Sequence, residues 1–297
     1  MKEFLVQSPL KINITLRIIE KCPDGYHSLG SGVLKFPRGE IIRFLEPSFE
    51  EPSLERDQIV TRNYPIEGTN ILFRALEIMR HKNPPFPFQN IVIEKSIPPG
   101  TGVGGGSGNL AAFLLWMERR YGITLEDREI ALLGADVPFL NSPHRGAFLT
   151  GIGEKIEPME VDFDCIVILC FPDWSSQTAK AYKDLDEKES QGFLCWSSEA
   201  SAREEMFSLM RKLRQGEFCG LMPNDFISVL PFQEAYASFF SLAASEGALA
   251  WGVSGSGSSM YALYPRREKG KTKKTQSFLE GVAALPWIQK TLYLESW

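Results

Sequence analysis

The sequence predicts an α+β protein with two domains. At 297 residues and 43% hydrophobic content, the chain can bury a large core, and its length suggests about two domains. Residues 11–19 alternate between apolar and polar side chains, as in a strand, whereas residues 70–82 carry apolar side chains at helical spacing. The second half alternates helix-like and strand-like segments, which suits a sheet covered by helices. From this order of elements we place the domains at residues 1–158 and 159–297.

The first half mixes strands and helices. Residues 11–19 should form a half-buried strand with a polar face, because every second residue is apolar. A helix is expected over 70–82, with Thr69 as its cap. A strand at 91–93 precedes a glycine-rich segment. A second helix then follows and ends at Gly122, and a short helix is expected over 125–133.

The second half is predicted from the same periodicities. Residues 166–171 read as a fully buried strand, and residues 184–199 as a polar, loop-rich stretch. Helices are expected over 202–213, 232–246 and 273–284. Strands are expected over 259–264 and 289–294.

Composition argues against several classes of protein. The net charge of −5 argues against bulk binding of nucleic acid, and the basic cluster at 266–274 reads as a solvated loop or helix end. The five cysteines form no CxxC pair and the three histidines lack the spacing of zinc ligands, so we expect reduced thiols and no metal centre. Without a signal-like segment or an 18-residue apolar run, we expect a cytoplasmic protein with no membrane partner.

The most informative segment is glycine-rich and covers residues 97–109, which read IPPGTGVGGGSGN. It lies between a strand-like run and a helix-like run. Glycine lets the backbone approach a ligand closely, and a helix start offers unpaired N–H groups and a positive dipole end. The segment therefore predicts a phosphate-binding loop.

Several types of glycine loop can be compared with this segment. A Walker A loop needs a lysine before its Ser or Thr, and none lies between Gly100 and Asn109. Gly100, Gly102 and Gly105 match the spacing of a dinucleotide-binding loop, but the repeated strand–helix units of that fold are missing. A flexible linker would not be held between a buried strand and a buried helix. A small-molecule kinase loop with its own consensus remains.

Five segments in fixed order resemble the GHMP kinase superfamily. They are 8–13 (SPLKIN), 23–27 (PDGYH), the glycine loop with Ser107, 134–138 (GADVP) and 254–257 (SGSG). Within this superfamily the second and fourth segments are most similar to the kinases of the non-mevalonate isoprenoid pathway. The resemblance covers about residues 7 to 262.

The resemblance implies a two-domain GHMP kinase fold. It would have an N-terminal domain like domain 2 of ribosomal protein S5 and a ferredoxin-like C-terminal domain. It implies ATP as co-substrate, Mg²⁺, and transfer to the 2-hydroxyl of 4-diphosphocytidyl-2-C-methyl-D-erythritol, by a monomer or homodimer. A mevalonate-type or homoserine-type kinase is the alternative within the superfamily. From a different class, the chain could be a degenerate homologue that binds ligands without transfer.

The resemblance also assigns residues to roles. Asp136 matches the catalytic aspartate, and a carboxylate can orient an alcohol and accept its proton. Lys11 matches a lysine near the same hydroxyl, where a cation stabilises the developing charge. The alternative for Asp136 is a structural role in a turn or as a helix cap, and the alternative for Lys11 is a solvated lysine on a strand. The residues that would bind ATP are Pro99, Gly100, Gly102, Val103, Gly104, Gly105, Gly106 and Ser107.

The acceptor is expected to contact a second set of residues. Asn13 matches a substrate-binding asparagine, Tyr26 could stack on a cytosine ring, and His27 could read its edge. Tyr182, just after Thr178, aligns with a second stacking aromatic, although half-buried packing is an equal alternative for it. Base–aromatic stacking is worth about 1–3 kcal/mol per base, which is enough to select a cytidyl group.

The chain departs from the family pattern at four points, of which two, Leu10 in place of alanine and Ser258-Ser259 in the late turn, concern single motifs. The other two concern the glycine loop and the segment after it. Gly108 stands where a second serine is usual, so we expect a hydroxyl contact to phosphate to be lost. The segment between the glycine loop and Asp136 is about one helical turn shorter than usual. Gly108 and this shortened segment motivate the hypothesis of a degenerate homologue.

Overall fold

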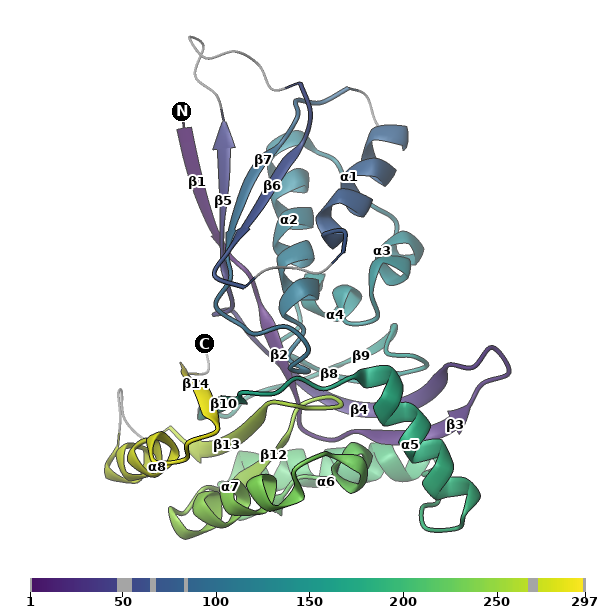
Figure 1. Ribbon diagram of the computed structural model, residues 1–297. Helices are drawn as coiled ribbons and strands as arrows, with labels where there is room; N and C mark the ends of the chain where they lie inside the picture. Colours follow the sequence, from purple (N-terminus) through teal and green to yellow (C-terminus); the bar gives the residue numbers. More distant parts are fainter. Residues whose placement is uncertain (1, 47–54, 65–67, 83–84, 267–271, 296–297) are drawn as a thin grey trace. The chain divides into compact units, whose positions relative to one another are not determined.

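The computed structural model describes residues 2–46, 55–64, 68–82, 85–266 and 272–295 (Figure 1). Its contacts divide the chain into two compact units. Unit 1 comprises Met1–Leu10, Pro37–Pro99 and Gly104–Pro143, and unit 2 comprises Lys11–Phe36, Gly100–Val103 and His144–Trp297. The chain passes between the units several times, whereas the predicted domains meet once, near residue 158. That predicted boundary stays a prediction.

The described residues form the following elements. The strands are β1 (Lys2–Gln7), β2 (Leu10–Asn13), β3 (Arg17–Lys21), β4 (His27–Phe36), β5 (Ile41–Glu46), β6 (Gln58–Arg62), β7 (Asn90–Glu94), β8 (Gly146–Thr150), β9 (Lys155–Met159), β10 (Cys165–Pro172), β11 (Gly220–Leu221), β12 (Ala250–Val253), β13 (Met260–Pro265) and β14 (Ile288–Glu295). The helices are α1 (Ile71–Lys82), α2 (Gly105–Tyr121), α3 (Asp127–Leu133), α4 (Val137–Asn141), α5 (Thr178–Ser190), α6 (Glu199–Gln215), α7 (Gln233–Ser245), α8 (Lys273–Ala283) and the 3-10 helix η1 (Asp225–Val229).

Unit 1 is one sheet with helices on one face. The strand order is β1-β5-β7-β6, in which β6 runs parallel to β7 and the other pairs are antiparallel. Helices α1 and α2 cover one face of this sheet (Figure 1), and their apolar sides complete the core with Ile42, Phe44, Ile91 and Ile93. The apolar face predicted for residues 70–82 is confirmed, since α1 buries Leu72, Ala75, Leu76 and Met79.

The ends of the helices in unit 1 were only partly predicted. The expected cap at Thr69 is wrong, because the Asn70 Oδ1 accepts the Leu72 N–H at 3.0 Å and α1 begins at Ile71. Asparagine caps helices at least as well as threonine, and Asn70 directly precedes the first residue of α1. The expected stop at Gly122 is confirmed, because this residue caps α2 with a φ of 69°.

Unit 2 contains two sheets. One has the order β11-β12-β13-β10-β14, and the other has the order β2-β4-β8-β9 with β3 also paired to β4. The single strand predicted over 11–19 is wrong, because β2 ends at Asn13 and β3 begins at Arg17. The half-buried character is wrong as well, since Lys11, Asn13 and Thr15 are also buried.

The predicted buried strand at 166–171 is confirmed, because every residue of β10 is buried. The expected loop over 184–199 is wrong at its start, where α5 continues to Ser190. Only Leu185 of α5 is fully buried, and it packs with Leu16, Ile18 and Phe226. A single buried residue leaves almost no apolar periodicity in the sequence, which explains the error.

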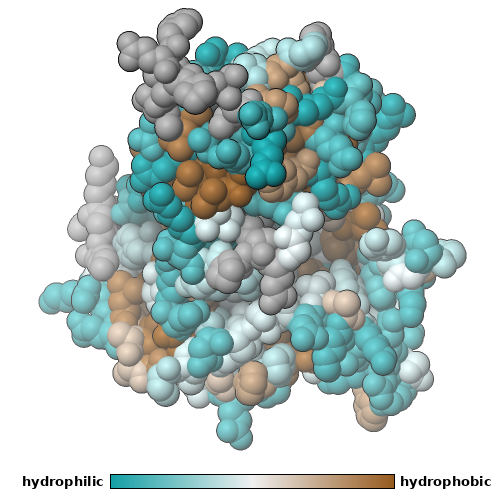
Figure 2. Space-filling view, turned by 45° about the horizontal axis from the view of Figure 1, so that its top comes forward, coloured by the Kyte–Doolittle hydropathy of each residue, from teal (hydrophilic) through white to brown (hydrophobic). Residues whose placement is uncertain are grey.

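Hydrophilic and neutral residues predominate on the face shown in Figure 2, and the hydrophobic residues there form separate patches. In the part of the chain that the structure describes, no helix is long and apolar enough to cross a membrane. The five cysteines are free thiols; Cys165 and Cys170 are buried, and Cys195 is exposed. Most of the basic cluster at 266–274 lies outside the described residues.

We expect Phe113→Ala to lower the free energy of unfolding by about 3–5 kcal/mol. Phe113 is fully buried in the core of unit 1, so truncation leaves a cavity. Urea denaturation monitored by circular dichroism measures the change. Leu132→Ala is the control, since Leu132 is 79% exposed and its loss should matter little. Equal effects of the two substitutions would contradict the assignment of this core.

Candidate active site

The glycine loop joins β7 to α2 through a series of left-handed glycines. Gly100, Gly102 and Gly104 have φ values of 68°, 75° and 70°, a region that disfavours other residues. Helix α2 begins at Gly105, inside the glycine-rich segment 97–109. Its first three residues, Gly105, Gly106 and Ser107, are small, and the N–H groups at such a position have no partners within the helix.

The surface of this first turn is open. Gly106 is exposed, and a Cβ added to it would meet no atom within 4 Å. Ser107 follows in the same turn and is half-buried. A helix start with positive dipole and unhindered N–H groups is an anion-binding arrangement, so Gly104, Gly105, Gly106 and Ser107 fit a phosphate group.

The segment 134–136 lies beside this helix start in unit 1. A Cβ on Gly134 would lie 3.5 Å from the Ser107 Oγ and 3.3 Å from the Val137 side chain. Asp136 is half-buried and directly precedes α4, which the structure describes in full. Asp136 occupies the N-cap position of α4, but its side chain makes no capping hydrogen bond to the helix.

Gly108 lies so close to the backbone of Pro9 that only glycine fits there. A Cβ at this position would lie 2.0 Å from the Pro9 carbonyl oxygen, which no side chain can tolerate. Gly108 is buried, and α2 contacts the backbone of Pro9 directly through it. The expected loss of a phosphate contact therefore has a structural reason: glycine is what the close packing of α2 on Pro9 requires.

Lys11 and Asn13 form the polar centre of unit 2. Both are 5% exposed, and the Lys11 Nζ donates to the Asn13 Oδ1 at 2.7 Å. The same oxygen accepts from the Gly255 N–H at 2.8 Å, and the Ser254 Oγ lies 3.3 Å from it. The Asn13 Nδ2 donates to the Ser31 Oγ at 2.8 Å. Asn13 thus holds the lysine ammonium and the turn at 254–257 in a fixed arrangement.

The loop residues Gly100–Val103 belong to unit 2 and pack on the same turn. The Ser254 Oγ donates to the Gly102 carbonyl at 2.9 Å, and the Lys11 N–H donates to the Val103 carbonyl at 3.0 Å. A Cβ at Gly102 would lie 2.1 Å from the Ser254 carbonyl oxygen. The loop can adopt this position only with glycine at residue 102.

Thr178 lies next to the other side of this turn. Its hydroxyl and the Ser256 hydroxyl are 2.9 Å apart, and the Ser176 Oγ donates to the Ser256 carbonyl at 2.7 Å. Thr178 is exposed at the first turn of α5. The structure thus brings Asn13, Gly102 and Thr178 together around residues 254–257.

His27 and Tyr182 lie in direct contact in unit 2. Their rings are stacked with centroids 4.5 Å apart and an interplanar angle of 18°. His27 is 6% exposed, and its Nε2 lies 2.6 Å from the Asp186 Oδ1. Tyr26 is 62% exposed. Of the expected aromatic residues, Tyr26 therefore presents the free ring, while one face of Tyr182 already contacts His27.

Asp186 fixes the orientation of the His27 ring. Burial would raise the pKa of the Asp186 carboxyl, but hydrogen bonds from Lys21 and His27 lower this pKa below its usual value. The carboxylate therefore stays ionised at neutral pH. Sequence reasoning missed Asp186, because 159 residues separate it from His27.

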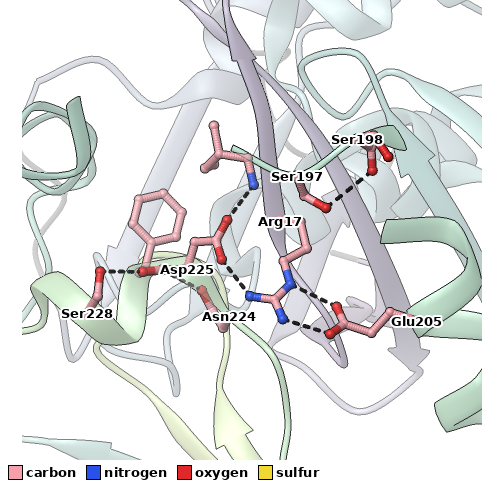
Figure 3. Close-up of polar contacts among 9 residues, drawn as sticks. Arg17, Ser197, Ser198, Glu205, Asn224, Asp225 and Ser228 are labelled. Atoms are coloured by element: carbon pink, nitrogen blue, oxygen red, sulfur yellow. Dashed lines mark hydrogen bonds and ion pairs between the residues drawn. The ribbon is translucent and has the colours of Figure 1, made fainter. Parts of the chain in front are cut away.

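Figure 3 shows a second set of charged residues in unit 2, which orders the chain around β3. The Arg17 guanidinium donates to Glu205 at 2.8 and 2.7 Å and to the Asp225 Oδ1 at 2.7 Å. Hydrogen bonds to Glu205 raise the pKa of Arg17. Asn224 caps η1 and donates to the Gly255 carbonyl at 2.9 Å. This cluster therefore supports the turn at 254–257.

The predicted site residues fall into both units. Unit 1 holds Asp136, Pro99 and the loop from Gly104 to Ser107, whereas unit 2 holds Lys11 and the acceptor set. The convergence of Lys11 and Asp136 on one hydroxyl stays a prediction. Within the described residues, no group of three or more His, Cys, Asp or Glu side chains could hold a metal ion.

The comparisons with known proteins agree with this architecture. The sequence profile of the GHMP kinases N terminal domain matches residues 70–143, which contain α1, the glycine loop and Asp136. Among solved structures, a 4-(cytidine 5'-diphospho)-2C-methyl-D-erythritol kinase superposes with a TM-score of 0.74 at 23% identity. This alignment covers 99% of this chain and 98% of that one. A homoserine kinase from Cytophaga hutchinsonii superposes with a TM-score of 0.60 at 16% identity, over 100% and 95% of the two chains. The predicted GHMP kinase fold is confirmed.

Two relatives in sequence carry the same kinase name. The 4-diphosphocytidyl-2-C-methyl-D-erythritol kinase of Carboxydothermus hydrogenoformans is 29% identical over 93% of this chain and 94% of its own. The chloroplastic/chromoplastic enzyme of that name from Solanum lycopersicum is 35% identical over 59% of this chain. That match spans 45% of the tomato protein, less than half of its length. The predicted resemblance is confirmed: the chain is similar to these kinases in sequence and shares their fold.

We expect Gly108→Ala to destabilise the protein by about 1–3 kcal/mol or more, because the added methyl group collides with the Pro9 carbonyl. Thermal unfolding measures the change. Gly106→Ala is the matched control on the same helix turn, where the space is open and alanine favours a helix by about 1 kcal/mol. A Gly108→Ala variant as stable as the wild type would show that α2 does not need this contact.

Proposed function

We propose that the protein transfers the γ-phosphoryl group of ATP to a hydroxyl of a small-molecule acceptor. The observation that carries the proposal is the glycine loop, which ends in an open helix start in unit 1 and packs beside the buried Lys11 in unit 2. Phosphoryl transfer depends mainly on positioning and on stabilising charge, and these parts supply both. Magnesium would neutralise charge on the phosphate oxygens. Because Mg²⁺ is held largely by the phosphates and by water, it would need few ligands from the protein.

Asp136 is the residue that would orient the acceptor hydroxyl and take its proton. Gly134, two residues before Asp136, lies against Ser107, so a phosphate at the start of α2 would be near this segment of unit 1. Lys11 would stabilise the alkoxide and the transferring group. Its ammonium is already oriented by Asn13, which lowers the entropic cost of placing it.

The proposed acceptor is 4-diphosphocytidyl-2-C-methyl-D-erythritol, phosphorylated on its 2-hydroxyl. The full-length relatives bear the name of the kinase for this compound. The exposed Tyr26 ring beside the fixed His27 suits a planar base, since a base can stack on the ring and hydrogen-bond to neighbouring backbone. Homoserine and mevalonate lack any base, so these residues favour the cytidyl compound over them.

We expect Asp136→Asn and Lys11→Met to reduce kcat by 100-fold or more, because each removes a group that acts on the reacting hydroxyl. Nucleotide affinity should change only a few-fold. Steady-state assays of ADP release and calorimetry with a non-hydrolysable ATP analogue measure the two quantities. Asp127→Asn, at an exposed carboxylate of α3, is the control. Full turnover in either variant would remove that residue from the mechanism.

We expect Tyr26→Ala to raise the KM for the cytidyl acceptor by about 5- to 150-fold, the equivalent of one base–aromatic stack. The KM for ATP should stay unchanged. Phe193→Ala, at another exposed aromatic residue, is the control. Equal turnover of homoserine or mevalonate by the wild type would contradict the acceptor, and ligand binding without any transfer would indicate a degenerate homologue.

A further inference from the structure

Glu40 is a fully buried carboxylate in unit 1 that the motifs above do not include. It directly precedes β5 and is 0% exposed. A buried carboxylate is costly unless it is paired and hydrogen-bonded, and Glu40 accepts from four donors through its two oxygens. These donors come from the entry of the glycine loop and from α2.

The first oxygen holds the chain where it leaves β7. The Glu40 Oε1 accepts the N–H groups of Ser96 at 3.1 Å and Ile97 at 3.0 Å. The next two residues, Pro98 and Pro99, have no N–H. Ser96 and Ile97 are therefore the last backbone donors before Gly100, and one carboxylate oxygen satisfies both.

The second oxygen joins a cation to the helix. The Glu40 Oε2 accepts from the Lys95 Nζ at 2.9 Å and from the Asn109 Nδ2 at 2.6 Å. Because a carboxylate can only accept, the Asn109 amide must turn its nitrogen toward Glu40. Its Oδ1 is then buried with no hydrogen-bond partner among the described residues. The bond to the charged oxygen evidently outweighs the loss of one neutral acceptor.

The backbone of Glu40 connects this cluster to a further segment. The Ser8 N–H donates to the Glu40 carbonyl, and the Glu40 N–H donates to the Ser8 Oγ, both at 2.8 Å. Ser8 immediately precedes Pro9, which contacts Gly108 of α2. One residue thus ties together the N-terminal segment, the entry of the glycine loop and the first turns of α2.

We propose that Glu40 is a positioning residue for nucleotide binding, an inference that rests on the proposed function. It fixes both ends of the glycine loop segment within unit 1, Ile97 before the loop and Asn109 after it, without touching the nucleotide. Buried ion pairs add little net stability compared with apolar residues, so the specific geometry they impose is the reason to keep one here. Phosphate affinity then depends on the charge of a residue that lies behind the loop.

The test compares Glu40→Gln with Asp57→Asn in the full chain. Asp57 is the matched control, since its carboxylate accepts from Arg80 at 2.6 and 2.8 Å and from the Gln89 N–H at 2.7 Å, at the opposite end of β7. Both variants should unfold at lower temperature. Only Glu40→Gln should raise the Kd for a non-hydrolysable ATP analogue with Mg²⁺, by 10-fold or more in calorimetry. The KM for the acceptor should stay within two-fold.

The results separate this inference from the proposed function. If the wild type binds no nucleotide, both fail. If the wild type binds it and Glu40→Gln binds it equally well, or if Asp57→Asn weakens it as much, only the role of Glu40 is overturned. If Glu40→Gln does not fold, the Asn109→Ala variant tests the proposal instead. This substitution removes the link between Glu40 and α2 but leaves the ion pair between Glu40 and Lys95. We expect it to weaken nucleotide binding at least three-fold, and unchanged binding would overturn the proposal.

Discussion

Direct contact between backbones at two glycines is the constraint on which the candidate site depends. At Gly102 and Gly108, a Cβ would lie 2.1 and 2.0 Å from the carbonyl oxygens of Ser254 and Pro9. Any other residue at either position would break the contact, because its Cβ would collide with the carbonyl oxygen. The first places the loop on the turn at 254–257 in unit 2, and the second places α2 on the N-terminal segment in unit 1. Gly106, which lies between these two glycines in the sequence, has open space where a Cβ would be.

Buried polar groups surround these contacts in both units. In unit 1 the Glu40 carboxylate collects donors from Ser96, Ile97, Lys95 and Asn109. In unit 2 the Asn13 amide does the same for Lys11 and Gly255. Such groups are costly to bury unless every donor meets an acceptor, and the resulting networks allow one arrangement of the chain. A loop of glycines, which is flexible by itself, becomes rigid because its neighbours are fixed in this way.

Sequence periodicity predicted the elements whose apolar faces are regular. The buried face of α1 and the fully buried β10 followed directly from spacing. The pattern over 11–19 indicated a polar face but contained no information on what covers it, and the structure buries that face too. Helix α5 buries a single leucine, so its periodicity was too weak to separate from a loop.

The candidate site was predictable where one short segment carries the chemistry. The glycine loop predicted an anion site from local order alone, and α2 indeed starts within it. The partners of each residue were not predictable, because they come from distant segments: Glu40 meets Asn109, and His27 meets Asp186. No local sequence pattern identifies Glu40, a single glutamate between Gly39 and β5, as the hydrogen-bond acceptor for a loop that begins more than fifty residues later.

Helix α5 carries Tyr182 and Asp186 one turn apart, and both act on the same imidazole ring. One residue covers a face of the ring and the other binds its edge nitrogen. A shift of α5 along its axis by one residue would disturb both contacts at once. The shape and the charge around His27 are thus both set by a single helix.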